Sequence, residues 1–208
     1  MDIRQIAGLA PVIPIITIDD AAIAVPLARA LVAGGLPVIE VTLRTDAAVA
    51  AAQAMIEQVP EAVVGLGTVT RREHIAAALD IGARFLVSPG FSAEIAALVQ
   101  GAGLPFLPGI ATPTELMAAL AAGFSILKFF PAEPAGGIDM LRALHAPFPE
   151  AAFCPTGGID ADKARAYLEL PNVVAVGGSW VAPRAAVGAK DWQKITALAR
   201  AARDLRKR

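Results

Sequence analysis

One alternation repeats along the chain: a short apolar run is followed by an alanine-rich stretch with the periodicity of an amphipathic helix. Eight apolar runs are predicted to be strands, at residues 12–18, 38–43, 63–69, 85–88, 106–107, 126–130, 152–155 and 173–176. Helices are predicted between them at 21–33, 47–58, 72–81, 93–100, 114–122, 160–168 and 191–206. Because crossover helices cover the outer face of a parallel sheet, near-continuous apolar strands joined by helices predict such a sheet.

Eight strand–helix units in one pass predict an α/β protein with a single (β/α)8 TIM barrel that occupies residues 1–208 as one domain. An open doubly wound sheet is the alternative, but it needs edge strands, and none of the runs is clearly more polar than the others. The unit after Gly136-Gly137 is expected to be shorter than the rest and broken by Pro147 and Pro149. Helix starts are indicated by the cap-forming residues Thr70, Ser92 and Thr112.

The composition narrows the classes of protein that the chain can belong to. Apolar residues make up 56% of the chain and charged residues 18%, which favours a sheet buried on both faces, a subunit interface, or both. No stretch of about 18 apolar residues runs without Gly, Pro or a charge, so no membrane-spanning segment is expected. The net charge is −1 with both signs scattered, which predicts no nucleic-acid partner.

The two ends of the chain and its single cysteine bear on where the protein is located. The basic end of the chain is interpreted as a solvated helix terminus, with cations at Arg203, Arg206, Lys207 and Arg208. The single cysteine, Cys154, rules out an internal disulfide, and the first residues lack the pattern of a signal peptide. The protein is therefore expected to be cytoplasmic.

The second predicted strand contains an ionisable residue where apolar ones are expected. Alternation places Glu40, Thr42 and Arg44 on one face of this strand. A carboxylate between Ile39 and Val41 is unfavourable unless it is paired or used. Glu40 is therefore interpreted either as one partner of a structural ion pair or as a functional group at the barrel mouth, where the active sites of such barrels lie.

The sixth predicted strand supplies a cation, Lys128, with two apolar residues on each side. An outward-pointing lysine can extend its stem to solvent, but helices cover the outer face of a barrel strand. Desolvation lowers the pKa of an inward ammonium, which makes neutral amine available to attack a ketone. Lys128 is therefore the candidate Schiff-base nucleophile, and Glu40 in the same interior is the candidate proton carrier.

Two Gly-Gly pairs end the last two predicted strands. Gly157-Gly158 follow Thr156, and Gly177-Gly178 precede Ser179. The N–H groups of glycine are unobstructed, and the loops after strands 7 and 8 are the usual phosphate site of this fold. Either pair alone would indicate only a tight turn, whereas both together predict a phosphate or similar anion.

Three further polar residues have less specific interpretations. Thr68, at the end of the third predicted strand, is either a ligand of a substrate oxygen or a residue of the helix-entry turn. His74 is expected in an amphipathic helix and His145 in a loop, so neither falls at a strand end. No cluster of His, Asp and Glu with metal-ligand spacing is present in the sequence, and no metal or separate cofactor is expected.

With these residues the chain resembles the bacterial 2-dehydro-3-deoxy-phosphogluconate (KDPG) aldolases, which often double as 4-hydroxy-2-oxoglutarate (KHG) aldolases. The matching segments cover the chain from end to end in the family's order. The most specific blocks are Glu40-x-Thr42-x-Arg44, Lys128-Phe-Phe-Pro-Ala-Glu133 and Pro155-Thr-Gly-Gly-Ile159. The chain departs from the family at Leu66, where an alanine is common, and after Gly137, where Ile138-Asp139 stand in place of a frequent lysine.

The resemblance implies a class I aldolase of the Entner–Doudoroff route, a (β/α)8 barrel that assembles as a homotrimer. Lys128 falls on the family's Schiff-base lysine and Glu40 on its general acid/base. Arg44 and Thr68 match positions that hold the pyruvyl carboxylate. The other implied substrate contacts are Pro89 and Phe130 in the pocket wall and Thr156, Gly157, Gly158 and Ser179 at the phosphate end, beside Gly178 of the second glycine pair.

The expected reaction is cleavage of KDPG, a keto-acid sugar phosphate, to pyruvate and glyceraldehyde 3-phosphate, with KHG cleavage to pyruvate and glyoxylate as a further activity. The iminium on Lys128 would accept the electron pair that a metal ion would otherwise polarise. Three alternatives are an aldolase for the galactonate epimer of KDPG, an isomerase or synthase that uses Lys128 only as a charge, and a non-catalytic sugar-phosphate sensor.

Overall fold

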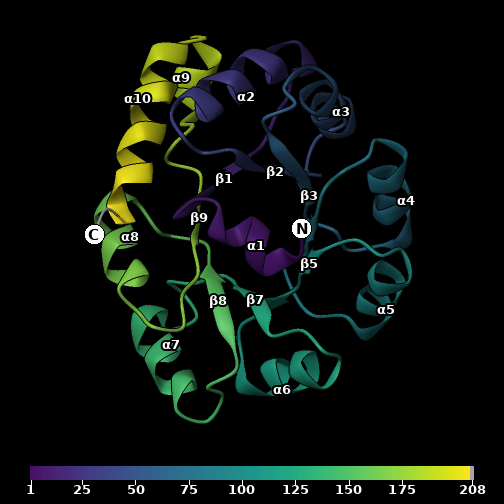
Figure 1. Ribbon diagram of the computed structural model, residues 1–208, viewed down its shortest axis with the longest axis vertical. Helices are drawn as coiled ribbons and strands as arrows, with labels where there is room; N and C mark the ends of the chain where they lie inside the picture. The colour runs from purple at the N-terminus through teal and green to yellow at the C-terminus, as the bar shows by residue number, and fades with distance from the viewer. Residues whose placement is uncertain (207–208) are drawn as a thin grey trace.

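The computed structural model describes residues 1–206 as an α/β fold in which parallel strands alternate with helices (Figure 1). The strands are β1 (Val12–Ile16), β2 (Val38–Thr42), β3 (Val63–Gly67), β4 (Leu86–Val87), β5 (Phe106–Leu107), β6 (Gly109–Ile110), β7 (Ile126–Phe129), β8 (Ala152–Pro155) and β9 (Val176–Gly178). Lys207 and Arg208, the last two cations of the basic end, lie outside the described residues.

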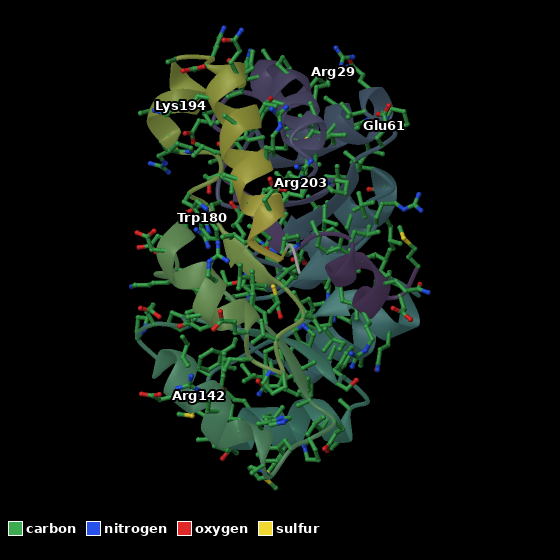
Figure 2. The ribbon with its side chains drawn as sticks, turned by 60° about the vertical axis from the view of Figure 1, so that its left-hand side comes forward. Arg29, Glu61, Arg142, Trp180, Lys194 and Arg203 are labelled. Atoms are coloured by element: carbon green, nitrogen blue, oxygen red, sulfur yellow. The ribbon has the colours of Figure 1, made fainter. Side chains whose placement is uncertain are left out.

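Helices surround these strands on the outside, except α1, which lies across the middle of the strand ring in Figure 1. The helices are α1 (Ile3–Gly8), α2 (Ala24–Ala33), α3 (Ala48–Gln58), α4 (Arg72–Asp80), α5 (Ala93–Gly101), α6 (Pro113–Ala121), α7 (Gly137–His145), α8 (Ala161–Leu168), α9 (Arg184–Gly188) and α10 (Trp192–Arg203), with 3-10 turns η1 (Ala21–Ile23) and η2 (Asp204–Arg206). Charged side chains such as Arg29, Glu61 and Lys194 project from the outer surface (Figure 2). Within residues 1–206, no helix is long and apolar enough to cross a bilayer.

The strand pairs are parallel, which confirms the predicted sheet type. Six strands form one sheet in the order β5-β4-β3-β2-β1-β9, and three form a second in the order β6-β7-β8. Isolated parallel bridges, Phe153 with Val173 and Thr156 with Gly177, connect the β8 side of the second sheet to the β9 side of the first. The division between β5 and β6 falls at Pro108, which has no N–H to donate to a ladder.

Three helices correct the prediction: α7, α1 and also α9 (Arg184–Gly188), which no predicted helical stretch covers. The unit after Gly136 is neither short nor broken, because α7 has nine residues, as many as α4, α5 and α6. Pro147 and Pro149 lie beyond its last residue, so they end the helix without interrupting it, and His145 is in a helix rather than in a loop. The helix α1 is absent from the prediction, although Asp2 and Gln5 form a capping box that marks its start.

The predicted helix caps are right in two places and wrong in one. The side chains of Ser92 and Thr112 accept the N–H groups of Ile95 and Glu115 and begin α5 and α6. Thr70 does not cap α4, whose N-cap is Arg71 without a side-chain bond.

The core has two layers. The larger one fills the space between the strands and the surrounding helices. The smaller one consists of apolar side chains on the opposite strand faces, among them Val38, Ile126 and Cys154, packed with Ile6 and Ala7 of α1. Because alternation puts Val38 on the face of Glu40 and Ile126 on the face of Lys128, this inner cluster lies beside the two ionisable groups, toward the strand N-termini.

Candidate active site

Lys128 and Glu40 meet in the interior, as the sequence predicts. Lys128 Nζ donates to Glu40 Oε1 at 3.1 Å and lies 3.5 Å from Oε2. The two side chains are only 5% and 3% exposed. One comes from β7 and the other from β2, in different sheets, so the pair exists only through the tertiary fold. At this separation one proton can pass directly between the amine and the carboxylate.

Glu40 has room for its carboxyl group because the neighbouring strand carries Gly67. A Cβ on Gly67 would lie 2.2 Å from Glu40 Oε1 and 2.6 Å from Glu40 Cγ. Any side chain at this position therefore displaces the carboxylate. The prediction does not single out Gly67, although a glycine inside a strand often marks the close approach of another group.

The loop after β3 brings Thr68 to Arg44. Arg44 Nε donates to Thr68 Oγ1 at 3.4 Å, and the Arg44 side chain has no ion pair with a described residue. Thr68 has a φ of 66°, a strained value for a β-branched residue. His74 of α4 accepts the N–H of Thr70 at 3.2 Å and so ties down this loop. The pKa of His74 is lowered, first by burial and second by the charge of Arg71. A lower pKa favours the neutral ring, which can accept this bond.

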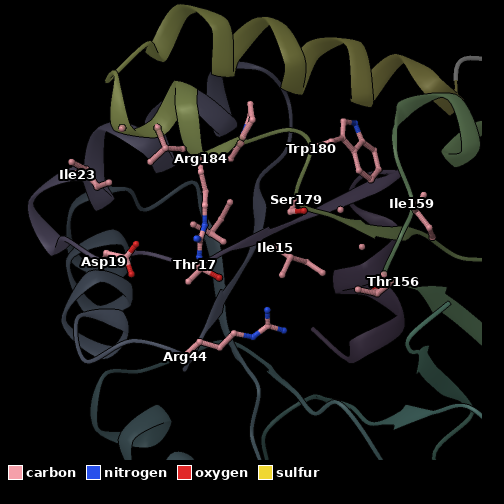
Figure 3. Close-up of a pocket in the computed structure, with 18 of the residues that line it drawn as sticks. Ile15, Thr17, Asp19, Ile23, Arg44, Thr156, Ile159, Ser179, Trp180 and Arg184 are labelled. Carbon is pink, nitrogen blue, oxygen red and sulfur yellow. The ribbon is translucent and has the colours of Figure 1, made fainter. Parts of the chain in front are cut away.

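A cavity of about 750 Å³ opens at the carboxyl ends of the strands (Figure 3). Among the residues that line it are seven of the predicted site: Arg44, Phe130, Thr156, Gly157, Gly158, Gly178 and Ser179. Phe130 connects the cavity to the buried pair, because its ring centroid is 5.3 Å from Lys128 Nζ. The other four predicted residues, Glu40, Lys128, Thr68 and Pro89, are not in the cavity lining, although Thr68 contacts Arg44, which is.

The loop at Gly157-Gly158 has the properties of an anion site. Both glycines have positive φ, 105° and 79°. The carbonyls on this loop accept bonds from the neighbouring segment, from the N–H of Ala132 to Thr156 at 2.8 Å and from the N–H of Glu133 to Gly157 at 3.1 Å. The N–H groups of the two glycines donate to no described residue. Such free N–H groups on a glycine loop suit a phosphate.

Three side chains, Glu133, Lys163 and Tyr167, bond to one another, and one of them bonds to this loop; we call them the Glu133 cluster. Glu133 accepts bonds from Tyr167 Oη and, at 2.6 Å, from Lys163 Nζ, which also donates to the carbonyl of Gly158 at 3.2 Å. The bond from Lys163, then that from Tyr167, lowers the pKa of Glu133. Burial and then the bond to Glu133 raise the pKa of Tyr167. The prediction includes Glu133 only as part of a motif and omits Lys163 and Tyr167, which lie in a helix of ordinary sequence.

Cys154 is the other nucleophilic side chain near Lys128. It pairs with Lys128 in the register of β7 and β8. Burial raises the pKa of its thiol to about 12, so it stays protonated near neutral pH and the amine is the available nucleophile. In the part of the chain that the structure describes, no three His, Cys, Asp or Glu side chains are grouped so that they could hold a metal ion.

Known proteins resemble this chain over nearly its whole length. The family model described as KDPG and KHG aldolase matches residues 3–198. The 2-dehydro-3-deoxy-phosphogluconate aldolase of Pseudoalteromonas atlantica is 47% identical over 199 residues, which cover 96% of this chain and 93% of that protein.

Two solved structures have nearly the same fold. The KDPG aldolase of Legionella pneumophila, with pyruvate captured at low pH as a covalent carbinolamine intermediate, has a TM-score of 0.95 and 43% identity, and the match covers 98% of both chains. The 2-keto-3-deoxy-6-phosphogluconate aldolase of Zymomonas mobilis ZM4 with 3-phosphoglycerate also has a TM-score of 0.95, with 45% identity over 99% of this chain and 97% of that one.

Proposed function

The chain belongs to the KDPG and KHG aldolase family, and on that premise we propose that it cleaves KDPG to pyruvate and glyceraldehyde 3-phosphate with Lys128 as the covalent catalyst. The observation that carries the assignment of Lys128 is its buried contact with Glu40 at 3.1 Å. A binding module has no need of a desolvated lysine beside a glutamate, next to a residue, Phe130, that lines the cavity. The family description supports KHG as a second substrate.

The first half of the reaction forms the covalent intermediate. A proton passes from Lys128 Nζ to Glu40, and the neutral amine attacks the C2 carbonyl of the substrate to form a carbinolamine. Glu40 then returns a proton to the C2 hydroxyl, which leaves as water, and the nitrogen becomes an iminium. Glu40 is unprotonated again and ready for the next step.

The second half breaks the C3–C4 bond. Glu40, directly or through a water, takes the proton from the C4 hydroxyl, and the electron pair of the C3–C4 bond moves toward the iminium nitrogen. Glyceraldehyde 3-phosphate leaves, and the enamine is protonated at C3. Water then adds to the iminium and releases pyruvate from Lys128. The iminium is the electron sink, so the scheme calls for no metal ion.

The two ends of the substrate are held by different groups in this scheme. Arg44, positioned by Thr68, binds the pyruvyl carboxylate through its forked N–H groups. The phosphate binds the free N–H groups of Gly157 and Gly158 with the hydroxyl of Ser179, near Thr156 and Gly178. Phe130 and Pro89 form the apolar wall on the pyruvyl side.

We also propose that the two sheets close into one (β/α)8 barrel that forms a single domain over the chain. The isolated bridges between the β8 and β9 sides support closure at one joint. Between β5 and β6, where the two sheets also meet, Pro108 is the single residue that links the strands, and its carbonyl accepts the N–H of Lys128 at 2.9 Å.

Homotrimer assembly and a cytoplasmic location remain proposals. Exposed apolar side chains on consecutive helices, Leu79, Leu98 and Met117, are 49%, 37% and 61% exposed and could be covered by another subunit. Light scattering should give three times the chain mass of 21.4 kDa; a monomer mass would contradict the trimer.

Trapping with borohydride tests the covalent mechanism. Incubation with pyruvate and borohydride should add one reduced pyruvyl group to the chain, and peptide mass mapping should find it on Lys128. The exposed Lys163 provides the internal control and should stay unmodified. Absence of any adduct would refute the Schiff base. Comparison of kcat/KM for KDPG, its galactonate epimer and KHG then identifies the preferred substrate.

A further inference from the structure

The cavity lining contains two cations, Arg184 and Lys190, that neither the sequence motifs nor the mechanism uses. Its charged lining residues are Arg44, Arg184, Lys190, Asp19 and Asp20. Figure 3 shows Arg44 and Arg184 extending toward the cavity from opposite sides. The Arg184 side chain forms no hydrogen bond or ion pair with any residue that the structure describes.

The backbone places Arg184 close in sequence to the proposed phosphate site. After Ser179 the chain makes a turn in which the N–H of Ala182 donates to the Ser179 carbonyl at 3.1 Å. Pro183 then begins α9, and its carbonyl accepts the N–H of Ala186 at 2.9 Å. Arg184 is thus the first residue of a helix that follows directly from the Ser179 end of the cavity.

The acidic residues in the lining set the balance of charge around Arg184. Asp20 is engaged, because its carboxylate accepts the N–H of Ala22 at 2.9 Å and caps η1. Asp19 is exposed and forms no ion pair with Arg184. Arg184 is therefore free to meet an incoming anion, whereas Asp19 repels one.

We propose that Arg184 is a specificity-determining residue that binds the terminal phosphate of the substrate, opposite the carboxylate bound by Arg44. This inference rests on the proposed function and adds the side chain that distinguishes a phosphorylated substrate from an unphosphorylated one. A guanidinium suits this role because it presents two parallel N–H donors to two phosphate oxygens. The free N–H groups of Gly157 and Gly158 supply the other donors.

The test compares KDPG with the same compound lacking its phosphate, 2-dehydro-3-deoxygluconate. Arg184→Gln should raise the KM for KDPG about tenfold, as expected for loss of a charge-assisted hydrogen bond. It should leave kcat for KDPG and the KM for the unphosphorylated compound unchanged. Asp19→Asn should change the KM for KDPG in the opposite direction, because it removes a repelling charge. Lys194→Gln, which removes an exposed cation outside the cavity lining, is the matched control and should match the wild type.

Binding of inorganic phosphate gives a readout that does not depend on turnover. Phosphorus NMR titration should show weaker binding to Arg184→Gln than to the wild type, with Lys194→Gln unchanged. An equal rise in both KM values, or no change in KM or phosphate binding, would overturn the role of Arg184. If the wild type cleaves none of the substrates while phosphate binding still depends on Arg184, the proposed function fails and the phosphate site stands.

Discussion

Residues 1–206 contain two Lys–Glu ion pairs near the same cavity, and the pair with the shorter N–O distance is not the one assigned to catalysis. Lys163 and Glu133 are 2.6 Å apart with side chains 46% and 32% exposed. Lys128 and Glu40 are 3.1 Å apart with side chains 5% and 3% exposed. Water screens the first pair, so its net contribution to stability is small. Neither partner of the second can be removed without leaving a buried charge.

The surroundings of a Lys–Glu pair decide what the pair can do. Lys163 Nζ also donates to the carbonyl of Gly158, so the exposed pair holds the Gly157-Gly158 loop in position. The buried pair has the Phe130 ring near its amine and the apolar cluster of Val38, Ile126 and Cys154 beside it, so little water is available to take a proton exchanged between Lys128 and Glu40. The same two residue types therefore fix the position of a glycine loop in one place and, in the proposed mechanism, form the catalytic couple in the other.

The largest effect is expected from Lys128→Ala. Removal of the nucleophile should lower kcat by at least about 10⁴-fold, because among the described lysines Lys128 is the one that contacts Glu40. It should also destabilise the fold by about 3–5 kcal/mol, unless the buried Glu40 takes up a proton. Turnover can be followed by pyruvate release and stability by urea unfolding. Lys163→Met is the matched control and should keep kcat within about threefold; a comparable loss there would remove the distinction between the pairs.

Glu40→Gln tests the proton transfer separately from the nucleophile. The amide has nearly the same shape but cannot carry the proton, so kcat should fall by about 10²–10⁴-fold. Borohydride should still trap pyruvate on Lys128, more slowly than in the wild type. The equivalent change on the other pair, Glu133→Gln, should leave kcat intact. Full activity in Glu40→Gln would assign the proton transfer to another group.

Gly67→Ala tests how closely Glu40 must be placed. The added methyl would meet the Glu40 carboxylate, so kcat should fall by about 10²-fold while the fold survives. Gly65→Ala on the same strand is the control, because its methyl would meet the Phe85 ring instead. That variant should lose about 1–3 kcal/mol of stability and keep its kcat. Equal kcat values for the two variants would contradict this assignment of Gly67.

In the kinetics, Glu133→Gln should affect only the binding of the phosphate end of the substrate. Weakening the bond from Lys163 loosens the Gly157-Gly158 loop, so the KM for KDPG should rise about threefold at unchanged kcat, as expected for an exposed pair. The KM for the unphosphorylated compound should not move. Tyr167→Phe removes the other bond to Glu133 and should have the same selective effect. A change in kcat in either variant would place the Glu133 cluster in the chemistry.

The smallest effect is a pH dependence of stability. The pKa of Glu133 lies below its ordinary value of 4.5, so this carboxylate stabilises the folded state above pH 4.5, and that contribution is lost as the pH falls through the folded-state pKa. The Tm of the wild type should therefore exceed that of Glu133→Gln near neutral pH, and the gap should narrow below pH 4.5. A gap that is independent of pH would mean that the charge of Glu133 is not the stabilising feature.

Local features of the fold were predictable because the residues that decide them are neighbours in sequence. Thr112 caps α6 through Glu115, three residues on, and Ser92 does the same for α5 through Ile95. The helix α1 carries an equally local signal in Asp2 and Gln5, which the prediction overlooked. The error at Pro147 and Pro149 has a different cause: proline shows where a helix must stop but not how long the helix before it is.

The candidate site was predictable in its chemistry and only partly in its geometry. Lys128 and Glu40 were expected to come close because inward side chains of a barrel share its interior, and their 3.1 Å contact, between strands of different sheets, confirms that they are close. The Glu133 cluster was not predictable, because Lys163 is an exposed lysine and Tyr167 a buried residue of an ordinary amphipathic helix, and nothing in that pattern indicates that both contact Glu133.

By itself, the sequence determined the alternation of strands and helices, the parallel sheet type, and the residue types able to form an iminium and bind an anion. Periodicity and capping act over a few residues, so these features can be read without knowing the fold. Only the tertiary structure decided that Gly67 makes room for Glu40, that the Gly157-Gly158 N–H groups are left free, and that Arg184 faces the cavity. These three features depend on packing between segments that are far apart in the chain. The same packing buries the Lys128–Glu40 pair and leaves the Lys163–Glu133 pair exposed, although the residue types are the same.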